Sequence, residues 1–150
     1  MVTLIRTDAE NEDLLSLVAL LDEELKLRDG DDHYFFAQFN KLAGIIGAVV
    51  AYVDGEPVGC GAFKGFSETE AEIKRMFVKP ESRGQRIAAK ILTELESWAR
   101  QTEFTACVLE TGFKQPEAIA LYKRSGYTEI PNYGQYAEVA ASVCMRKAIR

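Results

Sequence analysis

The chain has 150 residues, of which 47% are hydrophobic and 27% charged, and its net charge is −5. This profile is typical of one globular domain with its own core, and it excludes a disordered chain. The acidic balance argues against a nucleic-acid partner, which normally meets a basic face. No apolar run approaches the ~20 residues of a membrane helix, and no secretory leader is recognisable. We expect one domain over residues 1–150, in the cytoplasm, without a membrane partner.

The cysteines and the histidine argue against two further classes of protein. Cys60, Cys107 and Cys144 each lie in an apolar stretch, and three cysteines cannot all pair within one chain, so we expect reduced, buried thiols. The single histidine, His33, and the absence of a cysteine pair at ligand spacing indicate that the protein holds no metal. A disulfide framework and a metal centre are therefore not expected.

The first half of the sequence predicts a strand, two helices and three further strands. Residues 1–8 are typical of a short strand, and residues 33–43 predict a short helix. Residues 11–29 predict an amphipathic helix because apolar residues recur at three- and four-residue spacing. These residues are Leu14, Leu17, Val18, Leu21 and Leu25. Apolar runs at 47–53 and 57–65 are joined by the turn pair Asp54-Gly55, which favours an antiparallel hairpin. A further strand is expected at 70–78.

The second half predicts a helix from Gly84 to about Ala99, a buried strand at 105–111 and a helix at 116–125. Pro116 suits the first turn of that last helix and Gly126 its C-terminal cap. Strands are expected at 127–130 and 141–149. The order is β-α-α-β-β-β-α-β-α-β-β, which indicates an α/β fold with a mixed sheet and helices on its faces, not a doubly wound nucleotide fold.

The stretch "ESRGQRIAAKIL" at 81–92 gathers positive charge where a helix begins. A helix N-terminus already carries unpaired N–H groups and partial positive charge. Arg83 and Arg86 add cations there, while Gly84 and Ala88 leave the backbone open to a ligand. Cations at this end oppose the helix dipole unless an anion binds, so the stretch predicts a phosphate or pyrophosphate site. The alternative interpretation is a solvated helix start.

This stretch resembles the fingerprint R/Q-x-x-G-x-G/A of the GNAT superfamily, the acyl-CoA-dependent N-acyltransferases. Arg83 and Ala88 match its ends, and Arg86 replaces its middle glycine. The segment "QPEAIALYKRSGY" resembles the family pattern N-x-x-A-x-x-L-Y-x-x-x-G-F/Y, with Gln115 in place of asparagine. The resemblance covers most of the chain and is strongest from Glu72 to Tyr136. It implies a twisted mixed sheet of six to seven strands with about four helices, and acetyl transfer from acetyl-CoA, as co-substrate, to a primary amine.

The resemblance also implies which residues bind the cofactor. In the family, the strand before the loop bulges and splays, and its backbone pairs with the pantetheine arm. The matching residues here are Met76, Phe77 and Val78, which are also plausible as core residues; both interpretations can hold together. Gln115 and Tyr122 would complete the cleft. The residues implied for the pyrophosphate are Arg83, Gly84, Gln85, Arg86, Ile87 and Ala88.

Two catalytic residues are implied. Tyr122 matches the tyrosine that faces the thioester sulfur, where a phenol suits the general-acid role; the alternative is a core tyrosine. Glu72 is the candidate general base, with Glu110 and Glu70 as runners-up, and the alternative for Glu72 is a solvated strand end. In a regular strand, alternation would place Glu72 on one face with Lys74, Met76 and Val78.

The acceptor side is less specific in the sequence. His33, beside two aspartates, could bind a cationic amine or cap a helix. Tyr133 and Tyr136 belong to an aromatic loop in the region where similar family members wall the acceptor pocket, and Glu110 lies in the strand before it. We expect a small primary amine as acceptor, and a homodimer through residues 137–145 is plausible. Two other functions stay open: a CoA-binding module without turnover, and an acetyltransferase acting on protein N-termini or lysines.

Overall fold

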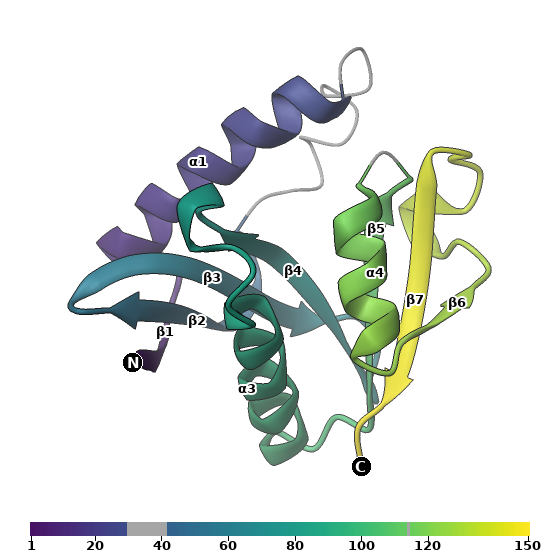
Figure 1. Cartoon of the computed structure of the whole chain (residues 1–150). Helices are drawn as coiled ribbons and strands as arrows, with labels where there is room; N and C mark the ends of the chain where they lie inside the picture. The colour runs from purple at the N-terminus through teal and green to yellow at the C-terminus, as the bar shows by residue number, and fades with distance from the viewer. Residues whose placement is uncertain (30–41, 114) are drawn as a thin grey trace.

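The computed structural model describes residues 1–29, 42–113 and 115–150. Within them, one seven-stranded sheet has the order β1-β2-β3-β4-β5-β7-β6 (Figure 1). The strands are β1 (Val2–Thr7), β2 (Ile45–Val53), β3 (Glu56–Gly65), β4 (Glu70–Val78), β5 (Ala106–Gly112), β6 (Thr128–Ile130) and β7 (Ser142–Ala148). The helices are α1 (Glu12–Asp29), α3 (Ile87–Gln101) and α4 (Pro116–Arg124), with short 3-10 helices η2 (Pro80–Ser82) and η3 (Gly134–Tyr136). The predicted α/β class and element order are confirmed; the helix predicted at 33–43 lies outside the described residues.

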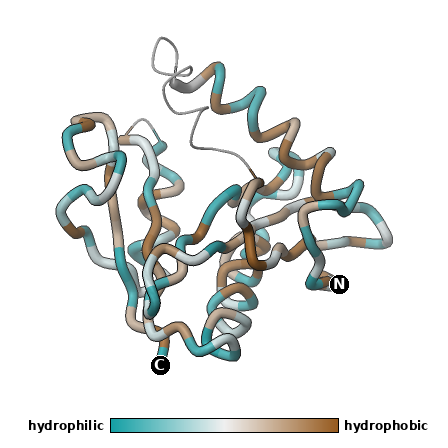
Figure 2. Tube along the Cα trace, turned by 180° about the vertical axis from the view of Figure 1, so that it is seen from behind, coloured by the Kyte–Doolittle hydropathy of each residue, from teal (hydrophilic) through white to brown (hydrophobic). Residues whose placement is uncertain are grey.

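Helices cover both faces of the sheet because successive strand residues point to opposite sides. Leu14 and Leu17 of α1 pack against Val50 of β2 and its neighbours on one face. On the other face, Ile91 and Leu95 of α3 pack with the alternate strand residues, and α4 joins them through its buried tyrosine. Figure 2 shows the alternation of hydrophobic and hydrophilic positions along α1 that the sequence predicts for an amphipathic helix.

A β-bulge interrupts β4 opposite β3. Lys74 pairs with Ala62 and Phe77 with Cys60, so β4 holds one more residue than β3 between these pairs. Arg75 lies at this point with a φ of 58°, in the left-handed region. An extra residue reverses the alternation of side chains beyond it.

The shared face that a regular strand would give Glu72, Lys74, Met76 and Val78 is therefore not formed. Ile73, Met76 and Val78 all contribute to the core on the α3 side, whereas Phe77 packs on the α1 side. The bulge thus separates Met76 from the polar residues that precede it on the strand.

β4 also diverges from β5. The two strands pair in parallel only at Glu70↔Ala106, Ala71↔Cys107 and Glu72↔Val108, and β5 then continues beside β7. Figure 1 shows the two strands separating beyond this point. The end of β4 therefore has an edge that β5 does not cover, as the resemblance implied for a bulged and splayed strand.

Cys60, Cys107 and Cys144 are free and buried, as the sequence predicts. Burial raises the pKa of Cys60 and of Cys107 to about 12, so these thiols are unreactive at neutral pH. In the part of the chain that the structure describes, no helix is long and apolar enough to cross a membrane. In the same ranges, no three His, Cys, Asp or Glu side chains are grouped so that they could hold a metal ion.

Candidate active site

A cleft of about 770 Å³ opens where β4 leaves β5. Its walls come from one side of α1, the end of β4, the loop before α3, the first turn of α3 and one side of α4. Of the predicted cofactor residues, all of which the structure describes, every one but Gln85 lines this cleft. Those lining it are Met76, Phe77, Val78, Arg83, Gly84, Arg86, Ile87, Ala88, Gln115 and Tyr122.

The N-terminus of α3 forms one end of the cleft and has no side-chain cap. The Lys90 N–H is the first to bond back, to the Arg86 carbonyl, so the three preceding N–H groups, at 87–89, have no partner within the helix. Gly84 has a φ of 83°, and a Cβ there would meet nothing within 4 Å. Open backbone and unpaired N–H groups together make this end suited to an anion.

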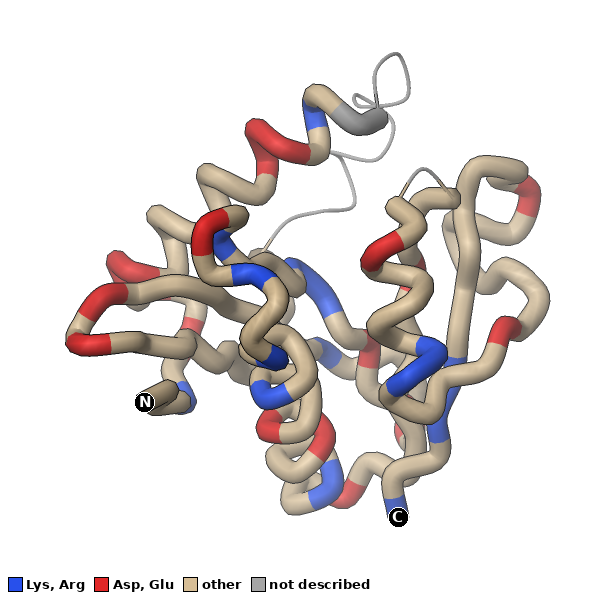
Figure 3. Tube along the Cα trace, viewed as in Figure 1, with Lys and Arg blue, Asp and Glu red and all other residues tan. Residues whose placement is uncertain are grey.

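Arg86 stands where the family pattern has glycine, and its conformation explains that preference. Its φ is 64°, in the left-handed region that costs a residue with a Cβ roughly 1–2 kcal/mol. The side chain is exposed and forms no ion pair with any described residue. Figure 3 shows a run of positive positions where the chain turns into α3. Arg86 is therefore a cation available at the mouth of the cleft.

Arg83 has a different environment from the one that the sequence suggested. Its Nε donates to the Val78 carbonyl at 2.8 Å, and a terminal nitrogen donates to Glu24 of α1 at 2.7 Å. Its guanidinium also lies 5.7 Å from the centre of the Phe77 ring. Arg83 thus joins α1 to the end of β4 while lining the cleft. Sequence reasoning missed Glu24, which looks like any exposed acid on a helix.

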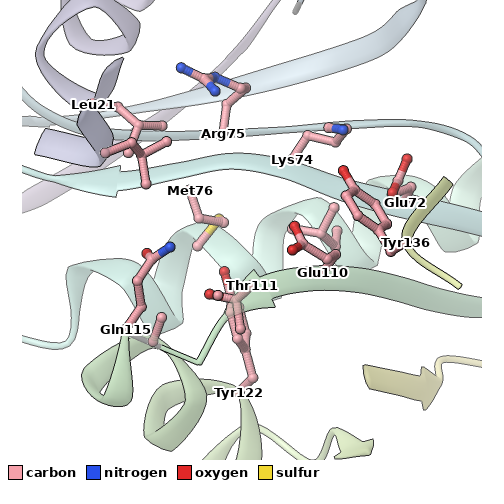
Figure 4. A pocket seen from close by; sticks show the side chains of 14 residues that line it. Leu21, Glu72, Lys74, Arg75, Met76, Glu110, Thr111, Gln115, Tyr122 and Tyr136 are labelled. Atoms are coloured by element: carbon pink, nitrogen blue, oxygen red, sulfur yellow. The ribbon is translucent and has the colours of Figure 1, made fainter. Parts of the chain in front are cut away.

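A smaller cavity, of about 100 Å³, adjoins the cleft. The two hollows share five lining residues and so meet at one place, between β4 and α4. The shared residues are Leu21, Met76, Gln115, Ala118 and Tyr122. Polar side chains that line only the small cavity include Glu72, Lys74, Arg75, Glu110, Thr111 and Tyr136. Figure 4 shows Glu72, Glu110 and Tyr136 at one end of this group and Arg75 at the other.

The three candidate bases lie in different surroundings. Glu72 is only 3% exposed, and its carboxylate accepts a hydrogen bond from the Tyr133 hydroxyl at 2.9 Å, so a solvated strand end is the wrong interpretation. Glu110 accepts a hydrogen bond from Ser142 at 2.7 Å. Glu70 instead pairs with Arg146 at 2.9 Å and lines neither hollow. The structure brings Glu72 and Glu110 together and leaves Glu70 outside.

Tyr122 stands at the junction of the two hollows. It is buried and packs edge-to-face against Tyr127, with ring centres 5.9 Å apart. Burial first, and the charge of Glu110 second, raise its pKa above the ordinary 10.0. The phenol therefore stays protonated at neutral pH and can donate a proton. Tyr122 is therefore part of the hydrophobic core and also lines both hollows.

The aromatic loop at η3 contributes Tyr136 to the wall of the small cavity. Tyr136 is buried, and Tyr133 packs between it and Phe66 with ring centres 6.0 and 4.6 Å away. Burial and the neighbouring Glu72 raise the pKa of Tyr133, and burial and Glu110 raise that of Tyr136. His33 and the two aspartates beside it lie outside the described residues.

Two cations of the cavity were not recognised as site residues from the sequence. Lys74 and Arg75 are both buried, and burial lowers the pKa of Lys74 while the charge of Glu72 opposes that change. In a regular strand these neighbours would face opposite sides. Because of the bulge, both residues line the small cavity. No pattern of residues in the sequence predicts a bulge.

Known proteins are similar to this chain in sequence and in fold. Residues 8–127 match the family model of the Acetyltransferase (GNAT) family. An Azospirillum brasilense protein named "IAA acetyltransferase" is 35% identical over 95% of this chain and 97% of its own length. A Klebsiella pneumoniae structure presented as an acyl-CoA N-acyltransferase is 32% identical, with a TM-score of 0.84 over 100% of this chain and 99% of that one.

A Thermoplasma acidophilum N-acetyltransferase, solved in complex with coenzyme A, covers 97% of this chain and 99% of its own with a TM-score of 0.72. At 18% identity it supports the fold alone. The chain belongs to the GNAT acetyltransferase family, whose members are acyl-CoA-dependent N-acyltransferases. The fold and activity class implied by the motifs are thereby confirmed.

Proposed function

We propose that this protein transfers the acetyl group of acetyl-CoA to the primary amine of a small molecule, by direct attack within a ternary complex. The observation that carries this proposal is the meeting of the two hollows at Met76, Gln115 and Tyr122. A thioester entering from the cleft and an amine entering from the cavity would meet there. Holding two reactants together removes much of the entropic barrier to their reaction, so no acyl-enzyme is needed.

The cleft suits the two polar parts of acetyl-CoA. The diphosphate would cap α3, accepting hydrogen bonds from the N–H groups at 87–89 and from the Arg86 side chain. The pantetheine amides would pair with the uncovered edge of β4 at Met76, Phe77 and Val78, as an added strand does. A cleft of about 770 Å³ is within the usual size of cofactor sites.

The chemistry assigned to the junction is two proton transfers, one from the attacking nitrogen and one to the departing sulfur. The amine attacks the thioester carbonyl, a C–N bond forms and the C–S bond breaks. Glu72, which holds a hydrogen bond from Tyr133, would take the proton that the amine loses. Tyr122 would give a proton to the departing thiolate, whose conjugate acid has a pKa of about 8.5, well below that of the phenol.

A small acceptor is favoured over a protein substrate. The cavity has a volume of only about 100 Å³, below the range for drug-sized ligands. The loop at η3 packs onto its far side through Tyr133 and Tyr136. A peptide would need an open groove at this place.

Calorimetric titration with acetyl-CoA, followed by thiol release with a panel of amines, tests the proposal. We expect micromolar binding that weakens in Arg86→Ala but not in Lys90→Ala. Lys90 is the matched control because it is an exposed cation one turn into α3 that does not line the cleft. Acetyl-CoA binding without thiol release for any amine would replace the enzyme with a CoA-binding module. The absence of any binding would overturn the cofactor site itself.

A further inference from the structure

Two arginine side chains that line the cofactor cleft have no ion-pair partner among the described residues. Arg86 lies at the start of α3 and Arg124 in the last turn of α4. Both are exposed, and no ion pair between described residues includes either of them. Arg83, also in the cleft wall, is instead held by Glu24 and the Val78 carbonyl. Figure 3 shows positive positions both where the chain turns into α3 and at the end of α4.

The cation next to Arg124 in the chain has a different environment. Lys123 also lies in the last turn of α4, but it pairs with Glu129 at 3.6 Å and does not line the cleft. Cations in the last turn of a helix stabilise its dipole, and Lys123 does this as well as Arg124. Stabilisation of the helix end therefore does not explain why Arg124 lines the cleft.

The acids in the cleft wall do not neutralise Arg124. Among the described lining residues these are Glu24 and Glu117. Glu24 is engaged by Arg83 at 2.7 Å. Glu117 lies in the first turn of α4, two turns before Arg124 and so roughly 10 Å away along the helix axis. The end of α4 therefore presents a positive charge to whatever occupies the cleft.

Acetyl-CoA carries its negative charges in two separate places. Its diphosphate links the pantetheine arm to the ribose, and its third phosphate is a monoester on the 3′ oxygen of that ribose. In the proposed function the diphosphate engages the start of α3 and Arg86. A phosphate monoester carries close to two negative charges at neutral pH, and a guanidinium matches it in charge and geometry. Arg124 is the arginine of the cleft wall that the diphosphate leaves available.

We propose that Arg124 binds the 3′-phosphate of acetyl-CoA and so makes the cleft selective for the complete coenzyme A nucleotide. This inference rests on the proposed function, which has the diphosphate at the start of α3. Ala88 of α3 and Leu121 of α4 also line the cleft and give the nucleoside apolar surface. A thioester on the phosphopantetheine arm of a carrier protein has no 3′-phosphate and lacks this contact. Arg124 is then a specificity-determining residue for the acyl donor.

Calorimetric titration with CoA and with 3′-dephospho-CoA tests this assignment, because the two ligands differ only in the 3′-phosphate. We expect the wild-type protein to bind CoA roughly tenfold more tightly, the value of one charged hydrogen bond. Since Arg124 is exposed, this preference should shrink as the ionic strength rises. The values of kcat/KM for the two acetylated donors, measured with one amine, should show the same preference.

Variants assign the preference to Arg124. In Arg124→Ala we expect CoA to bind roughly tenfold more weakly and 3′-dephospho-CoA to bind as before, so that the ratio falls to about one. Lys123→Ala is the matched control, because it removes a cation from the same turn of α4 outside the cleft, and the ratio should persist. Arg86→Ala should weaken both ligands alike, since both keep the diphosphate.

A second substitution keeps the test independent of folding. Arg124→Lys retains the charge without the planar fork and should retain part of the preference. Thermal melting identifies any variant that does not fold. If Arg124→Ala is one of them, the wild-type ratio and Arg124→Lys carry the test.

Two results would overturn this inference while leaving the proposed function intact. One is equal wild-type affinity for CoA and 3′-dephospho-CoA, with acetyl transfer to an amine retained. The other is an equal loss of affinity for both ligands in Arg124→Ala, which a contact with the diphosphate or a structural role would produce. A preference for CoA without acetylation of any amine would instead overturn the proposed function alone. If neither ligand binds, both fail.

Discussion

The cofactor cleft and the acceptor cavity meet at Met76, Gln115 and Tyr122, but different structures form their walls. The phosphate end of the cleft is a helix N-terminus, where consecutive N–H groups and Arg86 lie together because they are neighbours in the chain. The cavity takes side chains from α1, β4, β5, α4 and η3, which meet because β4 and β5 diverge. If the two hollows have the proposed roles, phosphate binding depends on local backbone geometry, and acceptor selection depends on the packing of distant elements. Substitutions in the two regions should therefore alter different kinetic quantities.

The largest effect is expected at the junction. Tyr122→Phe should lower kcat by roughly 100-fold or more, because a general acid typically contributes 10²–10⁴-fold, while acetyl-CoA affinity stays unchanged. Steady-state kinetics and calorimetry measure the two quantities. Tyr127→Phe is the control, since that tyrosine packs against Tyr122 but bonds to Glu96 and lines neither hollow. Full turnover in Tyr122→Phe would remove the general acid from the mechanism.

A somewhat smaller loss of activity is expected when the candidate general base is changed. Glu72→Gln should reduce kcat/KM for the amine by roughly 100-fold, because the amide cannot accept the proton. It should also change the pH dependence of kcat/KM. Glu70→Gln, on the same strand but paired with Arg146 outside the cavity, should behave as wild type. An unaltered pH profile in Glu72→Gln would transfer the role of base to Glu110 or to water.

Arg86 should affect cofactor affinity and leave the chemical step alone. Arg86→Ala and Arg86→Gly should each weaken acetyl-CoA binding roughly tenfold, the value of one charged hydrogen bond, with kcat little changed. Their stabilities should differ: glycine tolerates the φ of 64°, so Arg86→Gly should unfold with about 1 kcal/mol more free energy than Arg86→Ala. Calorimetry and denaturant titration measure both. Equal affinity in all three proteins would mean that backbone N–H groups alone bind the phosphates.

The smallest effect is expected in alkaline solution. An acid with the ordinary tyrosine pKa of 10.0 would be half ionised at pH 10, halving kcat. Because burial raises the pKa of Tyr122, its protonated form persists beyond that pH, and kcat should not decline up to pH 10. The kcat–pH profile at saturating substrates measures this, with circular dichroism to show that the fold is intact. A falling limb centred at or below pH 10 would contradict the assignment.

The free energy of unfolding should decline as the pH rises above 10. Tyr122, Tyr127 and Tyr136 all have a raised pKa in the folded state, so the unfolded chain releases their protons first. The stability associated with their protonated forms is complete below pH 10 and is lost as the pH rises above it. The loss approaches about 1.4 kcal/mol per tyrosine for each pH unit.

Much of the fold and of the cofactor site was predictable because the signals are local. The period of α1, the turn at Asp54-Gly55 and the cations before α3 each occupy a short stretch, and the structure contains the elements that they predict. The cofactor residues proved to line one cleft because most of them are consecutive.

The acceptor side was less predictable because its residues are far apart in sequence. Glu72 was recognised through the family pattern, but its burial depends on Tyr133, 61 residues away. Arg83 was assigned only to phosphate, although it also pairs with Glu24, 59 residues away. Contacts of this range leave no periodicity for a reader of the sequence to detect.

The sequence by itself determined the order of helices and strands, the family and the cationic start of α3, because periodicity, turn pairs and helix termini are properties of neighbouring residues. Only the tertiary structure decided the bulge at Arg75, the face to which Met76 turns and the position of Tyr136 in the cavity wall. A bulge adds one residue to a strand without changing its composition, and it reverses every side chain beyond it. The alternation expected of a regular strand therefore ends within β4, the strand whose residues line both hollows.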